Sequence, residues 1–274
     1  MSRLSEPQVN FFRTFGFLGF PGLLKADLPW ILEEFEAVHA GTGKGHDPSK
    51  RTCVAGFLDR SEKLSGLLEH PAIAGILHAL LGEDFNYHGS DGNYYSGDTG
   101  WHADCADEQI HGRYLKIAFY LDPLDGQSGA LRVVPGSHRV GEPYAQAVRH
   151  ALRTRGSLPC EPRDLPCQIL ATRPGDVLVF DHHTLHASFN GGNRRRMFTL
   201  NAGTRAQTPQ QFEEIRRIVH GAARFWADRC YGDALIRTAT PERRKHLEQQ
   251  LAFEPELPAL VEEAKRRMPE PARG

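Results

Sequence analysis

From about residue 84 onward, the apolar residues of this chain leave the helical spacing of its first part and fall into short runs. Gly, Pro, Asp and Ser bound these runs, which is typical of β-strands joined by turns. The runs span residues 85–95, 114–121, 130–134, 177–180 and 195–202. Several short strands at this spacing predict a mainly β core, an antiparallel sandwich or barrel of the jelly-roll type.

The start of the chain predicts a helix followed by a short strand. Ser5, with Gln8 three residues later, is typical of a capped helix start. Gly16 is expected to end this helix, and the apolar residues 17–20 form a short buried strand behind it.

Further helices are predicted on both sides of the β core. Asp27 is expected to cap a second helix, and residues 71–81 form a third. Helical signals return behind Thr208-Pro209 and again behind Thr240-Pro241.

The domain organisation follows from these elements. Residues 40–56 mix Gly, Lys and His without an apolar period, which predicts a loop. No internal repeat and no linker interrupts the chain, so we expect one domain over residues 1–274. It would consist of an N-terminal helical support (1–83), the β core (84–205) and a C-terminal helical extension (206–274).

Charge and hydropathy exclude several classes of partner. The formal net charge is −1, so the chain has no cationic excess for a polyanion, and nucleic acid is not an expected partner. No apolar run approaches the roughly 20 residues that a membrane-spanning helix needs. We therefore expect a cytoplasmic protein without a membrane anchor.

The cysteines are odd in number and scattered without a C-x-x-C pair, which argues against a disulfide framework and a structural zinc site. Free thiols are expected at Cys53, Cys105, Cys160, Cys167 and Cys230.

A possible metal site lies in the stretch Trp101-His102-Ala103-Asp104. A His-x-Asp pair at a strand end places an imidazole beside a carboxylate, and a third ligand from the distant stretch 181–188 (DHHTLHAS) would complete a face of three. Two His and one carboxylate with open positions opposite are the arrangement that holds non-haem Fe(II) for oxygen chemistry.

The stretch 128–138 (SGALRVVPGSH) resembles the signature of the phytanoyl-CoA dioxygenase family. It lies between the His-x-Asp pair and the distal His, as in that family. Pro174-Gly175-Asp176-Val177 and His186-Ala187-Ser188 resemble further family motifs in the right order. The resemblance implies a double-stranded β-helix (jelly-roll or cupin-like) flanked by helices, and an enzyme that uses Fe(II), 2-oxoglutarate and O2.

The resemblance also implies the metal ligands. His102, Asp104 and His186 correspond to the family's iron ligands. His182 and His183 are close in sequence, but the family pattern places the ligand directly before the small residue and Ser, so these two belong to the loop at the strand end.

The distal carboxylate of 2-oxoglutarate needs a bidentate cation inside the barrel, and Arg supplies that geometry. Side chains alternate along a strand, and an outward apolar face at 198, 200 and 202 leaves Arg195 facing the interior. Arg196 remains an alternative. Ser188 resembles the family's hydroxyl partner of the same carboxylate, and Asn93 matches an Asn near the co-substrate.

The same alternation along residues 114–121 places Tyr114, Lys116 and Tyr120 in the cavity, with Asp91 on another wall. A Lys inside a barrel needs an anionic partner or must keep its ammonium group in water. Lys116 either meets a substrate or co-substrate anion or extends to solvent, and both alternatives stay open. With Asp91 as a possible contact for a substrate cation, these residues predict a small polar substrate, anionic or zwitterionic.

Asp104 favours hydroxylation, because halogenases with this fold have a small residue at that position. Desaturation, cyclisation and epimerisation remain alternative outcomes of the same cofactor chemistry. A cupin-like enzyme without 2-oxoglutarate would not need Arg195 and Ser188, and a scaffold without metal would have lost a ligand. A monomer and a homodimer both remain open.

Overall fold

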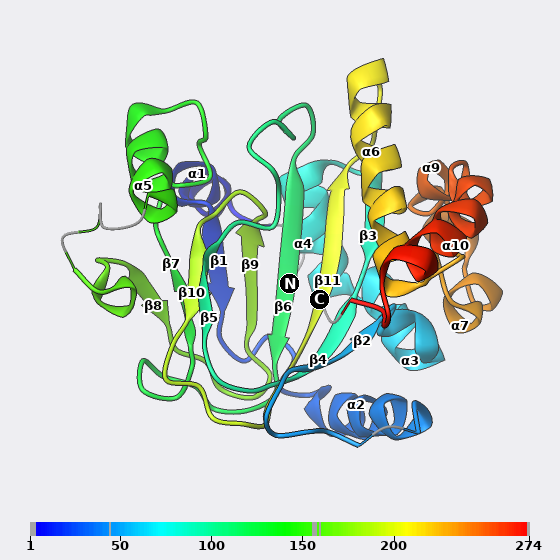
Figure 1. Cartoon of the computed structure of the whole chain (residues 1–274), viewed down its shortest axis with the longest axis horizontal. Helices are drawn as coiled ribbons and strands as arrows, with labels where there is room; N and C mark the ends of the chain where they lie inside the picture. The colour runs from blue at the N-terminus through cyan, green and yellow to red at the C-terminus, as the bar shows by residue number, and fades with distance from the viewer. Residues whose placement is uncertain (1–3, 44, 155–157, 159, 273–274) are drawn as a thin grey trace.

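The computed structural model describes residues 4–43, 45–154, 158 and 160–272. Two β-sheets form its centre (Figure 1). The larger sheet has the order β1-β9-β6-β11-β4-β2, and β3 also pairs with β11. Its strands are β1 Phe17–Phe20, β2 Thr52–Ala55, β3 Phe85–Gly89, β4 Asp91–Tyr95, β6 Tyr114–Tyr120, β9 Val177–Asp181 and β11 Arg195–Thr204.

The smaller sheet has the order β5-β10-β7-β8. Its strands are β5 Thr99–His102, β7 Leu131–Val133, β8 Gln168–Leu170 and β10 His186–Ser188. All pairings in both sheets are antiparallel. Two such sheets with a cavity between them form the double-stranded β-helix that the sequence predicts.

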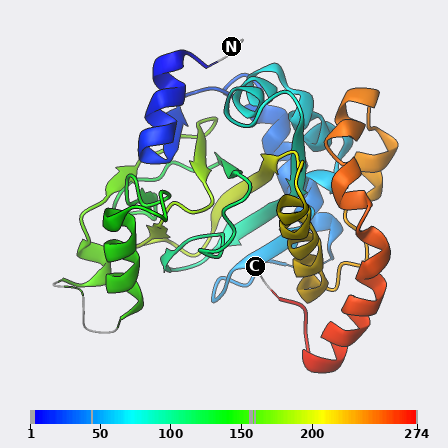
Figure 2. The same cartoon turned by 90° about the horizontal axis from the view of Figure 1, so that it is seen from above.

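Helices surround the two sheets: most of them cover the outside of the larger sheet and one of its edges, and α5 lies on the side of the smaller sheet (Figure 1). They are α1 Glu6–Phe15, α2 Leu28–Gly41, α3 Glu62–Ser65, α4 Pro71–Leu81, α5 Pro143–Arg153, α6 Pro209–Gly221, α7 Asp233–Arg237, α8 Pro241–Lys245, α9 Glu248–Leu251 and α10 Leu257–Arg267. Short 3-10 turns are η1 Leu58–Arg60, η2 Gly66–Glu69, η3 Pro162–Asp164, η4 Ala222–Phe225 and η5 Glu254–Glu256. Figure 2 shows the C-terminal helices gathered on one side of the molecule.

The predicted alternation along β11 is confirmed. Phe198, Leu200 and Ala202 are buried in the main apolar cluster, where the Phe198 ring stacks on Phe119 with 4.4 Å between centroids. The alternate residues Met197 and Thr199 line the cavity between the sheets. One face of the strand therefore stabilises the sheet and the other is left for the site.

The capped start of α1 and the helix behind Thr208-Pro209, which is α6, are confirmed. Ser5 and Gln8 form a reciprocal capping box at α1, and Gly16 ends that helix with φ of 84°. Thr208 and Gln211 form the same arrangement at α6. Asp27 precedes α2, but its side chain accepts no backbone hydrogen bond there; it accepts from the indole N–H of Trp30 at 3.1 Å.

The prediction of a loop over residues 40–56 is wrong at both ends, because α2 continues to Gly41. Residues 52–55 form β2, which pairs with β4 and places Thr52 opposite Tyr94. Lys44 lies outside the described residues. The strand was missed because its four residues carry no alternation of apolar and polar side chains.

The helix predicted behind Thr240-Pro241 is divided into α8 and α9. All five cysteines are free, as predicted.

Within the described residues, no single helix has the length and apolar character to cross a membrane. The bent pair formed by Glu62–Glu69 and Pro71–Leu81 meets those two criteria together.

Candidate metal centre and active-site cavity

Strand pairing brings the two candidate imidazole ligands together. β5 and β10 are neighbours, and His102 lies directly opposite His186. Ligand atoms of His102, Asp104 and His186 all lie within 4.8 Å of one another. The Nδ1 atoms of His102 and His186 bond to the carbonyl oxygens of Gly100 at 2.8 Å and Thr184 at 2.9 Å. A carbonyl only accepts, so each Nδ1 carries the proton and each Nε2 is free to bind a metal.

The charge states at this face suit a divalent metal. Burial lowers the pKa of His186 to about 4, so its imidazole is neutral at physiological pH. Burial alone would raise the pKa of Asp104, but the nearby Lys116 and His186 outweigh it and hold the pKa well below its usual range. A neutral imidazole and an ionised carboxylate are donors that non-haem iron prefers.

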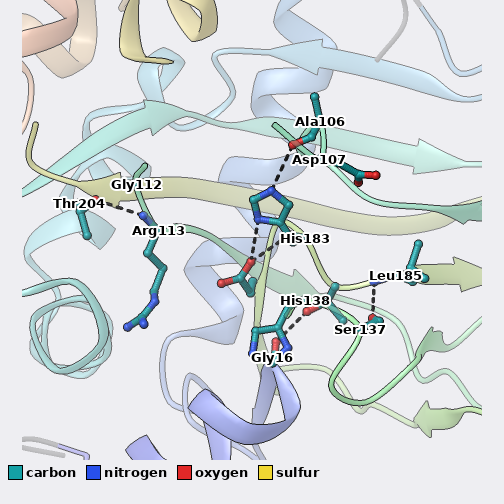
Figure 3. Close-up of polar contacts among 12 residues, drawn as sticks. Gly16, Ala106, Asp107, Gly112, Arg113, Ser137, His138, His183, Leu185 and Thr204 are labelled. Atoms are coloured by element: carbon teal, nitrogen blue, oxygen red, sulfur yellow. Dashed lines mark hydrogen bonds and ion pairs between the residues drawn. The ribbon is translucent and has the colours of Figure 1, made fainter. Parts of the chain in front are cut away.

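Neither His182 nor His183 belongs to the group of three, although the buried Nε2 of His182 has no hydrogen-bond partner among the described residues. The backbone carbonyl of His182 accepts from the Asp104 N–H at 2.8 Å, which fixes the loop that carries the carboxylate. The His183 ring contacts the carbonyl of Ala106 at 3.2 Å and the Asp181 carboxylate at 3.5 Å (Figure 3). His183 therefore anchors the turn and points away from the three candidate ligands.

Arg195 is the first residue of β11 and lies on the cavity wall. Its Nη1 donates to the hydroxyl of Ser188 at 2.6 Å and to the carbonyl of Gly129 at 2.9 Å. Its Nε is buried and has no hydrogen-bond partner among the described residues. A buried guanidinium with an unengaged donor beside a hydroxyl group fits the distal carboxylate of 2-oxoglutarate.

The side chain of Arg196 points away from the interior of the barrel. Its guanidinium bonds to Asp122 at 2.7 Å and to Glu36 at 3.0 Å. Arg194 is mostly exposed and lies 3.8 Å from Glu36. The structure thus places only Arg195 of these three arginines on the cavity wall, in agreement with the predicted alternation.

A cavity of about 1920 Å³ connects these groups. Its wall contains the three candidate ligands, Arg195 and Ser188, together with Tyr114, Lys116, Tyr120 and Asp91 as the sequence predicts. Asn93 does not line the cavity; it is fully buried, and its amide oxygen accepts from Arg51 Nε at 2.8 Å.

The family model for phytanoyl-CoA dioxygenase matches residues 12–197, and no curated protein matches the chain. The match covers more than half of the sequence and contains His102, Asp104, His186 and Arg195. The chain belongs to the phytanoyl-CoA dioxygenase family. It is an oxygenase that uses iron, 2-oxoglutarate and O2.

Solved structures share the fold of this oxygenase. The non-haem α-ketoglutarate-dependent carbocyclase SnoK from nogalamycin biosynthesis is 22% identical, with a TM-score of 0.55 over 73% of this chain and 84% of SnoK. HygX from Streptomyces hygroscopicus, with nickel and 2-oxoglutarate bound, is 17% identical, with a TM-score of 0.61 over 75% and 89%. EctD from S. alaskensis, with bound Fe, is 21% identical, with a TM-score of 0.59 over 76% and 81%.

Two ion pairs lie on the cavity wall of this oxygenase. Lys116 Nζ lies 2.8 Å from Asp104 Oδ2, and Asp91 Oδ2 lies 3.2 Å from Arg51 Nη2. The alternative in which Lys116 extends to solvent is therefore wrong, because the Asp104 carboxylate lies beside its ammonium group. These two charges do not by themselves require a charged substrate.

The tyrosines of β6 differ in their contacts. The Tyr114 hydroxyl donates to Glu214 on α6 at 2.6 Å, which ties the C-terminal extension to the barrel. Tyr120 lies opposite Met197, near Arg195, and its hydroxyl has no hydrogen-bond partner in the described part of the chain. Tyr120 thus lies at the Arg195 end of the cavity.

Sequence reasoning missed Arg51, which lines the cavity from the residue directly before β2. Asn93 and Asp91 hold its Nε and Nη2, and the guanidinium lies 4.6 Å from the centroid of the Tyr95 ring. The run Thr52-Cys53-Val54-Ala55 carries β-branched residues typical of a strand. That signal could have placed Arg51 at the sheet.

Proposed function

We propose that this oxygenase hydroxylates a C–H bond of a small polar metabolite that carries an anionic or zwitterionic group, with release of succinate and CO2. His102, Asp104 and His186 would hold Fe(II), and Arg195 with Ser188 would hold the distal carboxylate of 2-oxoglutarate. The observation that carries this proposal is the ligand set itself, two free Nε2 atoms and one carboxylate within 4.8 Å.

When bound, iron and 2-oxoglutarate supply the oxidation of the substrate by O2. The protein orients the groups. The carbonyls of Gly100 and Thr184 fix both imidazoles in one tautomer, and the Asp104 carboxylate occupies the position at which halogenases of this fold have a small residue. A carboxylate there leaves no room for a halide, which supports hydroxylation.

A polar substrate is supported by the wall around the metal face. Lys116, Asp91 and Arg51 all lie on it. Tyr114 and Tyr120 add two aromatic rings with polar ends. A long acyl chain would need a continuous apolar lining, and these side chains interrupt it. We propose that Lys116, Tyr114, Tyr120 and Asp91 form the substrate pocket.

A second outcome is cyclisation with the same cofactors. SnoK, a carbocyclase by name, shares the fold of this chain, and the outcome depends on which substrate bond lies at the metal rather than on the ligand set. Product analysis by mass separates the two: hydroxylation adds one oxygen atom, whereas ring closure removes two hydrogen atoms.

The proposal is tested by a screen for substrate-stimulated succinate formation. Small zwitterions and organic acids are compared with fatty acyl-CoAs, with Fe(II) and O2 present. We expect stimulation by polar acids, and none in Asp104→Ala, which lacks the carboxylate ligand. Preferential stimulation by acyl-CoAs would refute the substrate class, and turnover without 2-oxoglutarate would refute the co-substrate.

A further inference from the structure

Residues 103–113 form a loop that joins β5 to β6 and carries the candidate metal ligand Asp104. Ala103, Cys105 and Gln109 of this loop line the cavity beside that ligand. All residues of the loop are described, and none of them belongs to a helix or strand. Contacts with other parts of the chain must therefore hold the loop in place.

The start of the loop is held by the barrel and by α5. The backbone N–H groups of Asp104 and Cys105 donate to the carbonyl oxygen of His182, at 2.8 and 3.3 Å. Further along, the Asp107 carboxylate forms an ion pair with Arg149 of α5 at 2.8 Å. All of these partners lie within the residues of the family match.

The end of the loop is held by α6, which belongs to the C-terminal extension beyond the family match. The Glu214 carboxylate accepts from the backbone N–H of His111 through Oε1 and from that of Gly112 through Oε2, both at 3.0 Å. Three residues earlier on α6, the side-chain amide of Gln211 donates to the carbonyl oxygen of His111 at 2.8 Å. The helix thus engages both the N–H and the C=O group of one loop residue.

Glu214 is placed to hold this segment firmly. Only 2% of the residue is exposed, and the Tyr114 hydroxyl at the start of β6 donates a third hydrogen bond to its carboxylate, at 2.6 Å. Hydrogen bonds to a carboxylate are about twice as strong as those between neutral groups. Removal of the carboxylate would leave two backbone N–H groups and one hydroxyl without their acceptor.

The three candidate ligands differ in how the fold holds them. His102 and His186 lie opposite each other on the paired strands β5 and β10, so the strand pairing fixes both. Asp104 lies two residues beyond the end of β5. A functional group must be held within about 0.5 Å of its productive place, so the Asp104 carboxylate depends on the anchors of its loop.

We propose that Glu214 is a positioning residue of the metal centre. By holding the end of the 103–113 loop on α6, it sets the path of the loop and hence the place of the Asp104 carboxylate relative to His102 and His186. The inference rests on the proposed function, because it takes Asp104 as a ligand of Fe(II). It gives the C-terminal extension a role in metal binding, although none of the three ligands lies in that extension.

The test measures loop protection and metal binding instead of turnover. Hydrogen exchange of the metal-free protein should show faster exchange of the 103–113 amides in Glu214→Ala, because two of them lose their acceptor. Calorimetry with Mn(II) in place of Fe(II) should show a dissociation constant raised about tenfold or more, the loss typical of removing a group that orients a metal ligand. Glu214→Gln retains one acceptor oxygen, so both effects should be smaller in that variant.

Two substitutions on the same helix serve as controls. Val219→Ala weakens the packing of α6, because Val219 is 2% exposed and lies in an apolar cluster with Leu257. Glu213→Ala removes the carboxylate next to Glu214, which is half-exposed and pairs with Arg217 at 3.7 Å. Both variants should keep the loop protection and the Mn(II) affinity of the wild type. Circular dichroism shows which variants are folded, and Glu214→Gln carries the test if Glu214→Ala fails to fold.

Mn(II) binding to the wild type and to Asp104→Ala is measured first. If the wild type does not bind Mn(II), or Asp104→Ala binds it equally well, the ligand assignment of the proposed function is wrong and the inference falls with it. If that assignment holds, unchanged Mn(II) affinity or unchanged loop exchange in the Glu214 variants would overturn only the role of Glu214. An equal loss of affinity in Val219→Ala would also overturn it, because the effect would then come from the stability of the extension as a whole.

Discussion

The ammonium group of Lys116 lies 2.8 Å from Oδ2 of Asp104, inside the barrel and beside both imidazoles of the metal face. Less than a fifth of either side chain is exposed, at 18% for Lys116 and 17% for Asp104. Burial favours the neutral amine, but the charges of Asp104 and Asp91 outweigh it and raise the pKa of Lys116. Without metal, the ammonium group is the main compensation for the Asp104 charge.

Lys116→Met should therefore destabilise the metal-free protein. Removal of one partner of a buried ion pair costs about 3–5 kcal/mol, because the other charge is left buried and unpaired. Mn(II) should restore much of this loss, since the metal supplies positive charge at Asp104. Thermal unfolding with and without Mn(II) measures both effects.

Lys63→Met is the control for this prediction. Lys63 pairs with Glu34 at 3.2 Å and its side chain is 61% exposed, so its loss should cost no more than about 1 kcal/mol. If Lys116→Met loses no more stability than Lys63→Met, the ion pair with Lys116 does not stabilise the charge of Asp104. An unchanged substrate profile in Lys116→Met would also remove Lys116 from the substrate pocket.

The metal ligands are tested by single alanine variants. His102→Ala, Asp104→Ala and His186→Ala should each abolish Fe(II) binding in anaerobic titrations, because each removes one of three donors. His182→Ala should retain binding, since its contact to Asp104 is made by the backbone carbonyl, which the substitution keeps. Full Fe(II) binding in His186→Ala would refute the ligand assignment.

Arg195→Ala should raise the concentration of 2-oxoglutarate needed for half-maximal succinate formation. Loss of a buried, charge-assisted contact costs about 2–5 kcal/mol, which corresponds to at least a tenfold change. Arg194→Ala should change little, because that side chain is 57% exposed. A large effect of Arg196→Ala with a mild effect of Arg195→Ala would contradict the assignment of the co-substrate site.

Gly129→Ala should act on the same site through sterics. The backbone of Gly129 has φ of +91°, and a Cβ there would lie 2.4 Å from Arg195 Nη1. The strained backbone costs on the order of 1–3 kcal/mol of stability, and a displaced guanidinium should weaken 2-oxoglutarate binding. Calorimetry measures the binding. Gly192→Ala, which meets no atom within 4 Å, should leave both properties unchanged.

His39 should make the protein sensitive to acid. Burial lowers its pKa from 6.5 to about 4, so the unfolded chain binds a proton in this range that the folded protein does not. The free energy of unfolding therefore falls as the pH drops from 6.5 towards 4, by on the order of 3 kcal/mol for this one group.

His39→Leu should remove that contribution. Urea unfolding at a series of pH values should show a variant that gains stability relative to the wild type as the pH falls. A constant difference between the two proteins from pH 7 to pH 4.5 would show that His39 does not titrate in this way.

Much of this protein was determined locally and could be predicted from sequence. Alternation along β11 separated Arg195 from Arg196, because successive side chains on a strand face opposite sides wherever the strand lies. The capping pair of Ser5 and Gln8 and the Thr208-Pro209 signal identified two helix starts for the same local reason. The order of the family motifs indicated His102, Asp104 and His186 before any distance was known.

Only the tertiary structure decided which charges meet. Lys116 lies on β6 and Asp104 lies twelve positions earlier, just behind β5. Arg51 and Asp91 lie forty positions apart. Their pairing depends on how β6, β2 and β4 enclose one cavity. The alternation of side chains along a strand tells which side of the sheet a residue faces, but not which residue lies opposite it across the cavity. The same holds for Tyr114, whose hydroxyl meets Glu214 because the C-terminal extension packs against the barrel.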